Sequence, residues 1–146
     1  MQETDALYRS FLDSTDTVWF MREGSQIFRS QLRGIAPLLD YLDRFGPSDG
    51  QDIVIFDRVV GNAAALLMKL AGCGEIHAPL GSGHAVATLE ELGIDHHFQQ
   101  VVPHIVNRQG AGMCPFEKLS LGTTAAEFYP LAQSTLKRLN EGNAIP

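Results

Sequence analysis

A short buried strand followed by an apolar helix, over residues 52–72, constrains the fold of this chain more than any other segment. Residues 53–56 (IVIF) form an apolar, β-branched run too short for a helix, which is typical of a strand covered on both faces. Residues 63–71 favour a helix that is apolar on nearly every side, and Gly72 can end it. Such a helix must itself be covered by other elements. Open α/β sheets place ligand sites where a strand leads into a helix, as at Asp57–Arg58 here.

The rest of the chain predicts helices and strands that alternate around this unit. A hairpin is expected at 17–30, with Gly24 at positive φ in its turn, and Pro130 is expected to kink or split the last helix. We expect helices at 4–14, 35–42, 84–93 and 124–139 and further strands at 75–78 and 98–102. This order predicts an α/β fold, a three-layer α/β/α sandwich with a mixed sheet. We interpret residues 1–146 as a single domain, with an N-terminal helix within 1–14 and a C-terminal helix within 123–140.

Composition excludes several classes of function. The 146 residues carry a formal net charge of -6 without a basic run, so a nucleic-acid partner is not expected. Cys73 and Cys114 are the two cysteines, too few for a disulfide framework, which fits a reducing compartment. The polar, acidic N-terminus and the lack of a long apolar stretch predict a cytoplasmic protein without a membrane partner. Monomer and homo-oligomer are both compatible with the sequence.

The segment 107–117 (NRQGAGMCPFE) has the most unusual composition. Pro115 suits the first position of a short helix, which places Cys114 at the N-cap. The helix end favours a thiolate there, whereas a nearby Glu117 opposes it. Two interpretations are open. Cys114 is a reactive or substrate-contacting thiol, or it is a buried cysteine beside a glutamate that caps the helix.

The other polar candidates also allow two interpretations each. Asp57 and Arg58 are a general acid or base with an anion-binding arm, or an ion pair that closes the strand. Gly61 serves the tight turn and helix packing better than phosphate binding. Ser82, in the 79–83 loop before a helix, can contact an anion or simply act as the N-cap.

The five histidines show no metal-ligand spacing, so we expect no metal and no cofactor. His96 and His97 are adjacent, and on a strand they would face opposite ways. His104 is the histidine best placed for a proton shuttle, with an uninvolved surface residue as the alternative.

Four segments together resemble one family: 34–39, 57–65, 102–108 and 113–118. It is a bacterial and archaeal domain of unknown function whose fold is similar to that of the cytidine deaminases. The resemblance runs from about 18 to 119. It supports the three-layer fold and implies no established activity. The family usually has lysine where this chain has Arg58 and Asn62. By resemblance, the cleft would be lined by Asp57, Arg58, Gly61, Asn107, Arg108, Cys114 and Glu117.

The fold resemblance also allows a comparison with zinc deaminases. These enzymes use His or Cys with a Glu two residues later, and then Pro-Cys-x-x-Cys. Residues 57–59 (DRV) and 79–84 (PLGSGH) lack the cysteines and the glutamate, so zinc-dependent deamination is not expected.

Three hypotheses follow for the function. The first is a metal-free enzyme acting on a small nucleoside- or amide-like metabolite. Its catalytic residues would be Cys114, Asp57 and Glu117, and its ligand-binding residues Arg58, Gly61, Asn62, Ser82, Asn107 and Arg108. The second is a non-catalytic binding or regulatory module that keeps the same pocket. The third is a structural domain whose polar residues are satisfied by one another.

Overall fold

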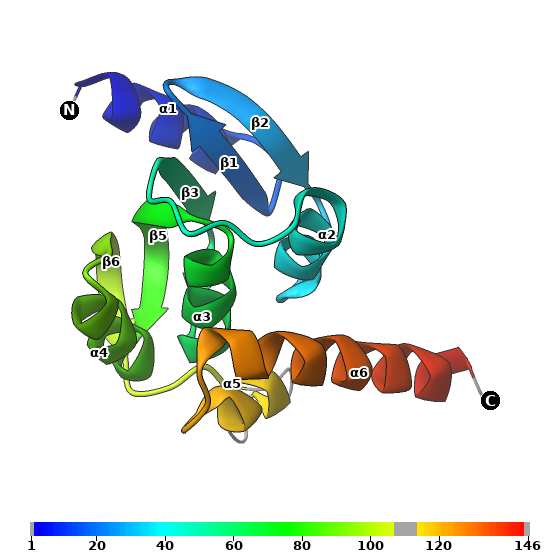
Figure 1. Ribbon diagram of the computed structural model, residues 1–146. Coiled ribbons are helices and arrows are strands. Elements are labelled where there is room, and N and C mark those ends of the chain that lie inside the picture. Colours follow the sequence, from blue (N-terminus) through cyan, green and yellow to red (C-terminus); the bar gives the residue numbers. More distant parts are fainter. Residues whose placement is uncertain (1, 107–113, 145–146) are drawn as a thin grey trace.

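A computed structural model describes residues 2–106 and 114–144 of the chain, and within them six helices surround a six-stranded mixed sheet (Figure 1). The elements are α1 (Gln2–Asp13), β1 (Val18–Arg22), β2 (Ser25–Ser30), α2 (Ala36–Phe45), β3 (Ile53–Asp57), β4 (Val59–Val60), α3 (Asn62–Leu70), β5 (Cys73–Ser82), α4 (Gly83–Leu92), β6 (Asp95–Val102), α5 (Pro115–Ser120) and α6 (Ala125–Ala144). None of these helices is long and apolar enough to cross a membrane.

The sheet combines an antiparallel hairpin with parallel strands. β1 pairs antiparallel with β2 on one side and with β3 on the other. β5 runs parallel to β3 and then to β4, and on its other side it runs parallel to β6. β6 and β2 therefore form the two edges, and β3 and β5 lie in the interior of the sheet.

Helices pack on both faces of this sheet, consistent with the predicted α/β sandwich. α1 packs on one face, where Phe11 joins Met21 and Phe56 in a small cluster. The other face carries the larger core, to which α2, α3, α4 and α6 contribute. α3 is buried from Asn62 to Met68, because α2, α4, α5 and α6 all contact it. The predicted need to cover this helix is confirmed.

Local turn chemistry also agrees with the prediction at several points. Gly24 has φ 78° in the hairpin turn, and Gly93 takes the left-handed conformation after α4. Pro130, however, does not split the last helix, which the structure assigns as one element from Ala125 to Ala144. Phe128 and Ala132 are fully buried on either side of the proline, and their packing offsets the missing backbone hydrogen bond.

The predicted loop at 79–83 is wrong, because β5 continues through Pro79 to Ser82. Pro79 lies between the registered pairs Ala78–Phe98 and Leu80–Gln100. No pair is registered at Pro79 itself, so the ladder with β6 is interrupted there, as expected for a residue without an N–H. Gly81 lies within this strand, where a Cβ would lie 2.2 Å from the ring of Phe98, so glycine leaves room for the ring. The predicted strand 98–102 likewise begins earlier, at Asp95.

Candidate functional site

Asp57 ends β3 in a buried position, as the sequence indicated. Its Oδ1 accepts a hydrogen bond from the backbone N–H of Arg58 at 2.7 Å. Burial raises the pKa of Asp57 to about 7, although backbone N–H groups of Arg58 and Val59 and the charge of Arg58 act in the opposite direction. A carboxyl group with this pKa can give or take a proton near neutral pH.

Arg58 turns away from Asp57 and binds the end of α1. Its guanidinium donates hydrogen bonds to the carbonyl oxygens of Phe11, Leu12, Ser14 and Asp16, at 2.8–3.2 Å. Its Cζ also lies 4.5 Å from the centroid of the Phe11 ring. The described residues show no Asp57–Arg58 ion pair within 4.0 Å. Arg58 therefore satisfies the helix C-terminus, and its donors are occupied rather than presented to a ligand.

Glu117, from α5, reaches the N-terminus of α3. Its Oε1 accepts hydrogen bonds from the backbone N–H groups of Asn62 and Ala63, the latter at 3.3 Å. A Cβ on Gly61 would lie 2.6 Å from this oxygen and 2.8 Å from Cγ1 of Ile105, so only glycine leaves room. Glu117 is 1% exposed, and its Oε2 has no hydrogen-bond partner among the described residues. The carboxylate is stabilised by the positive end of α3.

Asn62 is held within the same buried network. Its Nδ2 donates to Ser120 Oγ at 2.9 Å, and its Oδ1 accepts from Thr88 Oγ1. Ser120 Oγ in turn donates to the carbonyl oxygen of Glu117 at 2.6 Å. Gly61, Asn62 and Glu117 are thus brought together, and the contacts link α3 to α4 and α5.

Cys114 lies at the N-cap of α5, as predicted, and is half-buried. Its side chain makes no capping hydrogen bond, while its backbone N–H donates to the carbonyl oxygen of Ile105 at 2.8 Å. Within residues 2–106 and 114–144, no hydrogen bond joins the thiol of Cys114 to Asp57 or His104.

Three further residues were predicted to bind a ligand: Ser82, Asn107 and Arg108. Ser82 is fully buried at the N-cap of α4, where its Oγ accepts the backbone N–H of Ala85 at 3.0 Å. This is the capping alternative considered above. Asn107 and Arg108 lie outside the described residues.

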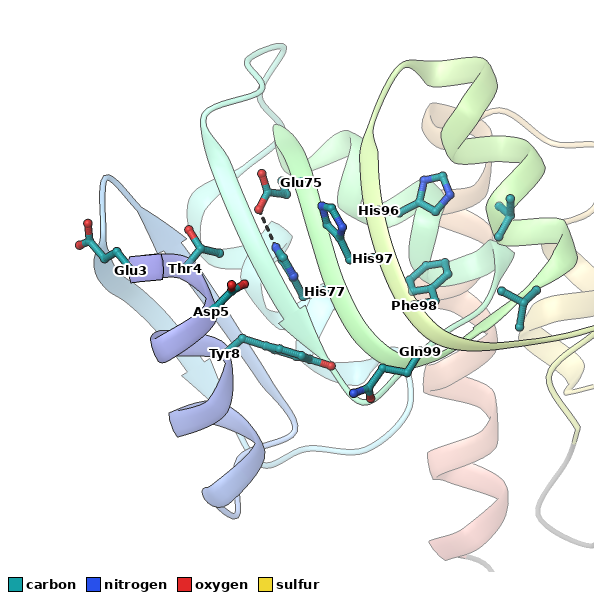
Figure 2. Close-up of a pocket in the computed structure, with 12 residues that line it drawn as sticks. Glu3, Thr4, Asp5, Tyr8, Glu75, His77, His96, His97, Phe98 and Gln99 are labelled. Carbon is teal, nitrogen blue, oxygen red and sulfur yellow. Dashed lines mark hydrogen bonds and ion pairs between the residues drawn. The ribbon is translucent and has the colours of Figure 1, made fainter. Parts of the chain in front are cut away.

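A groove between α1 and the β5–β6 edge of the sheet was not anticipated from the sequence (Figure 2). It has a volume of about 820 Å³ and extends over the edge strand β6 toward α4. Its lining residues come from α1, β5 and β6, with one residue from α4: Glu3, Thr4, Asp5, Tyr8, Glu75, His77, Val86, His96, His97, Phe98, Gln99 and Val101.

Three side chains in this groove, Glu75, His77 and His97, converge on the face toward α1. Each offers a possible metal-ligand atom, and the three atoms lie within 4.8 Å of one another. Nε2 of His77 lies 2.5 Å from Oε2 of Glu75. The rings of His77 and His97 stack with centroids 4.5 Å apart and planes at 17°. We call these three residues the groove triad.

The sheet register explains the triad. Glu75 and His77 are two residues apart on β5 and share a face, while His97 of β6 is registered opposite His77. His96 points to the other face, as Figure 2 shows, where its ring lies 5.3 Å from that of Phe98. The expectation that the adjacent histidines face opposite ways is confirmed. The sequence does contain a Glu-x-His pattern on one predicted strand and a histidine pair near the next strand. Spacing along the chain does not reveal that the two strands are neighbours or how they are aligned.

Tyr8 of α1 forms the opposite wall. Its ring centroid lies 5.4 Å from that of His77 and 5.5 Å from that of Phe56. Burial raises the pKa of the Tyr8 hydroxyl, and the charge of Arg58 opposes this shift. Its buried Oη has no hydrogen-bond partner among the described residues.

The groove has an acidic and imidazole-rich lining. Asp5 and Glu75 supply carboxylates, whereas the carboxylate of Glu3 points toward the hairpin turn, where a Cβ on Gly24 would lie 2.7 Å from its Oε1. Neither lysine nor arginine occurs among the described residues that line the groove. Such a surface attracts cations and disfavours phosphate or carboxylate groups.

Comparison with known proteins defines the family. The solved structures include a DUF1893 family protein (TM1506) from Thermotoga maritima, which is 25% identical, with a TM-score of 0.81 over 92% of this chain and 90% of that one. No curated protein matches the sequence. The family model for DUF1893, a domain of unknown function, matches residues 8–134. The protein described here therefore belongs to the DUF1893 family.

Proposed function

We propose that this protein binds a small molecule in the groove between α1 and the β5–β6 edge. The observation that carries the proposal is the groove itself, whose volume of about 820 Å³ lies in the range typical of ligand pockets. Its walls are helix and strand residues, with Tyr8 on one side and His77 and His97 on the other. This is the binding-module hypothesis, with its site moved from the α3–α5 region to the groove.

The lining selects a class of ligand. The carboxylates of Asp5 and Glu75, without a lysine or arginine among the described lining residues, favour a neutral or cationic molecule over an anion. The exposed imidazole of His97 provides a flat surface for an aromatic ring, and the exposed Gln99 can exchange hydrogen bonds with an amide. We therefore expect a nucleoside, nucleobase or amide-like molecule, and not a nucleotide.

A matched pair of variants tests this function. Isothermal titration with nucleosides and the corresponding 5′-monophosphates is expected to give binding of the nucleoside and none of the monophosphate. Gln99→Ala is expected to weaken binding, whereas Gln100→Ala, its neighbour outside the groove lining, should bind normally. Equal affinity for both compounds, or equal effects of both variants, would contradict the proposed site.

The resemblance to the cytidine deaminases supports a second candidate, a metal-free enzyme acting on a similar metabolite. The favouring observation is Asp57, whose pKa of about 7 suits general acid or base catalysis at the end of β3. Cys114 at the N-cap of α5 and Glu117 within that helix, with Asn107 and Arg108, would complete that site. The test is the alkylation rate of Cys114 with and without nucleosides. Protection of the thiol would support the enzyme, and an unchanged rate together with groove binding would leave the binding module.

A further inference from the structure

We propose that Glu75, His77 and His97 form a binding site for one divalent transition-metal ion, with Zn²⁺ as the best-matched probe. The donors are a carboxylate oxygen of Glu75 and one imidazole nitrogen each from His77 and His97. This inference goes beyond small-molecule binding, because it requires only these three side chains and no organic ligand.

The triad is positioned by regular secondary structure. Glu75 and His77 project from the same face of β5, and the parallel register of β5 and β6 places His97 beside His77. His77 is 8% exposed and packed between Tyr8 and Phe56, which restricts its ring. Donors fixed on neighbouring strands lose little conformational freedom when they bind an ion.

The distances require only side-chain adjustment. The three donor atoms lie within 4.8 Å of one another, and Glu75 and His77 are 2.5 Å apart. Four ligands about 2.0–2.1 Å from one zinc ion are roughly 3.3 Å apart in tetrahedral geometry. Glu75 and His77 must therefore separate slightly, and His97, which is exposed, must turn toward them.

The chemistry of the donors selects the metal. Two imidazoles and one carboxylate match zinc and neighbouring first-row ions, whereas Mg²⁺ and Ca²⁺ prefer oxygen ligands alone. Three protein ligands also leave a fourth position open, on the side of the groove. The carboxylate of Asp5 lines the same groove and adds to its attraction for a cation.

An alternative interpretation needs no metal. The Glu75–His77 contact satisfies both side chains as an ion pair, and His97 then merely stacks on His77. The two interpretations differ in His97. An ion pair with a stacked neighbour requires no donor atom from His97, whereas metal binding does.

The experiment titrates the full chain, first stripped with a chelator, with Zn²⁺ in competition with a chromophoric chelator and without any organic ligand. We expect one zinc per chain. His97→Ala should weaken binding by at least about 100-fold, since loss of a mere supporting contact already costs 10–100-fold. His84→Ala is the control, because it removes an imidazole that does not line the groove, and it should leave the affinity unchanged.

A second measurement covers the case in which a variant folds poorly. The wild-type chain loaded with Co²⁺ is expected to show the intense visible absorption of a four-coordinate site with nitrogen and oxygen donors, without a thiolate charge-transfer band. Absence of stoichiometric zinc, equal weakening by both histidine variants, or a thiolate band would overturn the proposal. Metal binding without nucleoside binding would contradict only the proposed function, and nucleoside binding without metal would contradict only this inference.

Discussion

The carboxylate of Glu117 caps the N-terminus of α3 through the backbone N–H of Asn62, 55 residues earlier in the chain. A short helix near the end of the family-matched region therefore stabilises the most buried helix of the fold. The contact also explains Gly61, because any side chain there would occupy the space of the carboxylate.

Replacement of Glu117 by alanine is expected to destabilise the protein by about 2–4 kcal/mol, because two buried backbone N–H groups lose their hydrogen-bond acceptor. Glu117→Gln keeps an acceptor oxygen of the same shape and should cost less. Urea unfolding of both variants measures the difference. A smaller loss for alanine than for glutamine would show that the buried carboxylate is not a cap.

Asp57 is expected to make stability depend on pH between about 4 and 7. Its pKa is raised from 3.8 to about 7 in the folded state, so the folded protein holds a proton that the unfolded chain releases. Stability contributed by this proton is fully present below pH 3.8 and is lost as the pH rises to about 7. A shift of this size corresponds to at most about 4 kcal/mol.

The measurement for Asp57 is the free energy of unfolding of wild type and Asp57→Asn across this pH range. The wild type should lose stability relative to the variant as the pH rises, and the difference should be constant above about pH 8. Parallel curves from pH 4 to 8 would contradict the raised pKa.

Arg58 is expected to be required for the attachment of α1, and through it for the groove wall that carries Tyr8. Arg58→Lys keeps the charge but cannot reach all the carbonyl oxygens that the guanidinium binds, so we expect a loss of about 1–3 kcal/mol. Arg44→Lys is the control, because Arg44 forms an exposed pair with Asp40. Equal effects in urea unfolding would refute the structural role.

The two thiols are expected to differ sharply in the folded protein. Cys73 is fully buried, and burial raises the pKa of its thiol to about 12, whereas Cys114 is half-buried. A thiol-specific disulfide reagent at pH 8 should modify one cysteine per native chain and two after unfolding. Cys114→Ser should abolish the native reaction. Modification of both thiols at one rate in the native protein would contradict the burial of Cys73.

Much of the fold was predictable because its signals are local. The strand at 53–56, the apolar helix after it and the glycines of the turns each follow from the properties of a few adjacent residues. The extent of β5 was not predictable in this way. Pro79 and Gly81 are typical of loops, and only the pairing of this segment with β4 and β6 shows that they lie within a strand.

The candidate site residues also differ in whether adjacent residues are enough to predict them. The N-cap positions of Ser82 and Cys114 follow from neighbouring residues and were anticipated. The Glu117–Asn62 contact and the groove triad were not, because they depend on helix packing and on the register of β5 with β6. The sequence left Arg58 either as an anion-binding arm or as the ion-pair partner of Asp57, whereas the packing of α1 gives its guanidinium other partners.

The close packing of Phe98 on Gly81 is expected to make any side chain at position 81 destabilising. A Cβ on Gly81 would lie 2.2 Å from the Phe98 ring, so Gly81→Ala must displace the ring or separate the two strands. We expect a loss of about 1–3 kcal/mol in urea unfolding. Gly83→Ala is the matched control, since its Cβ would meet nothing nearer than 3.7 Å, and it should be nearly neutral. In a Phe98→Ala background the cost of Gly81→Ala should largely disappear, because the colliding ring is absent. A full cost in that background would mean that Gly81 is required by the backbone of β5 and not by the ring.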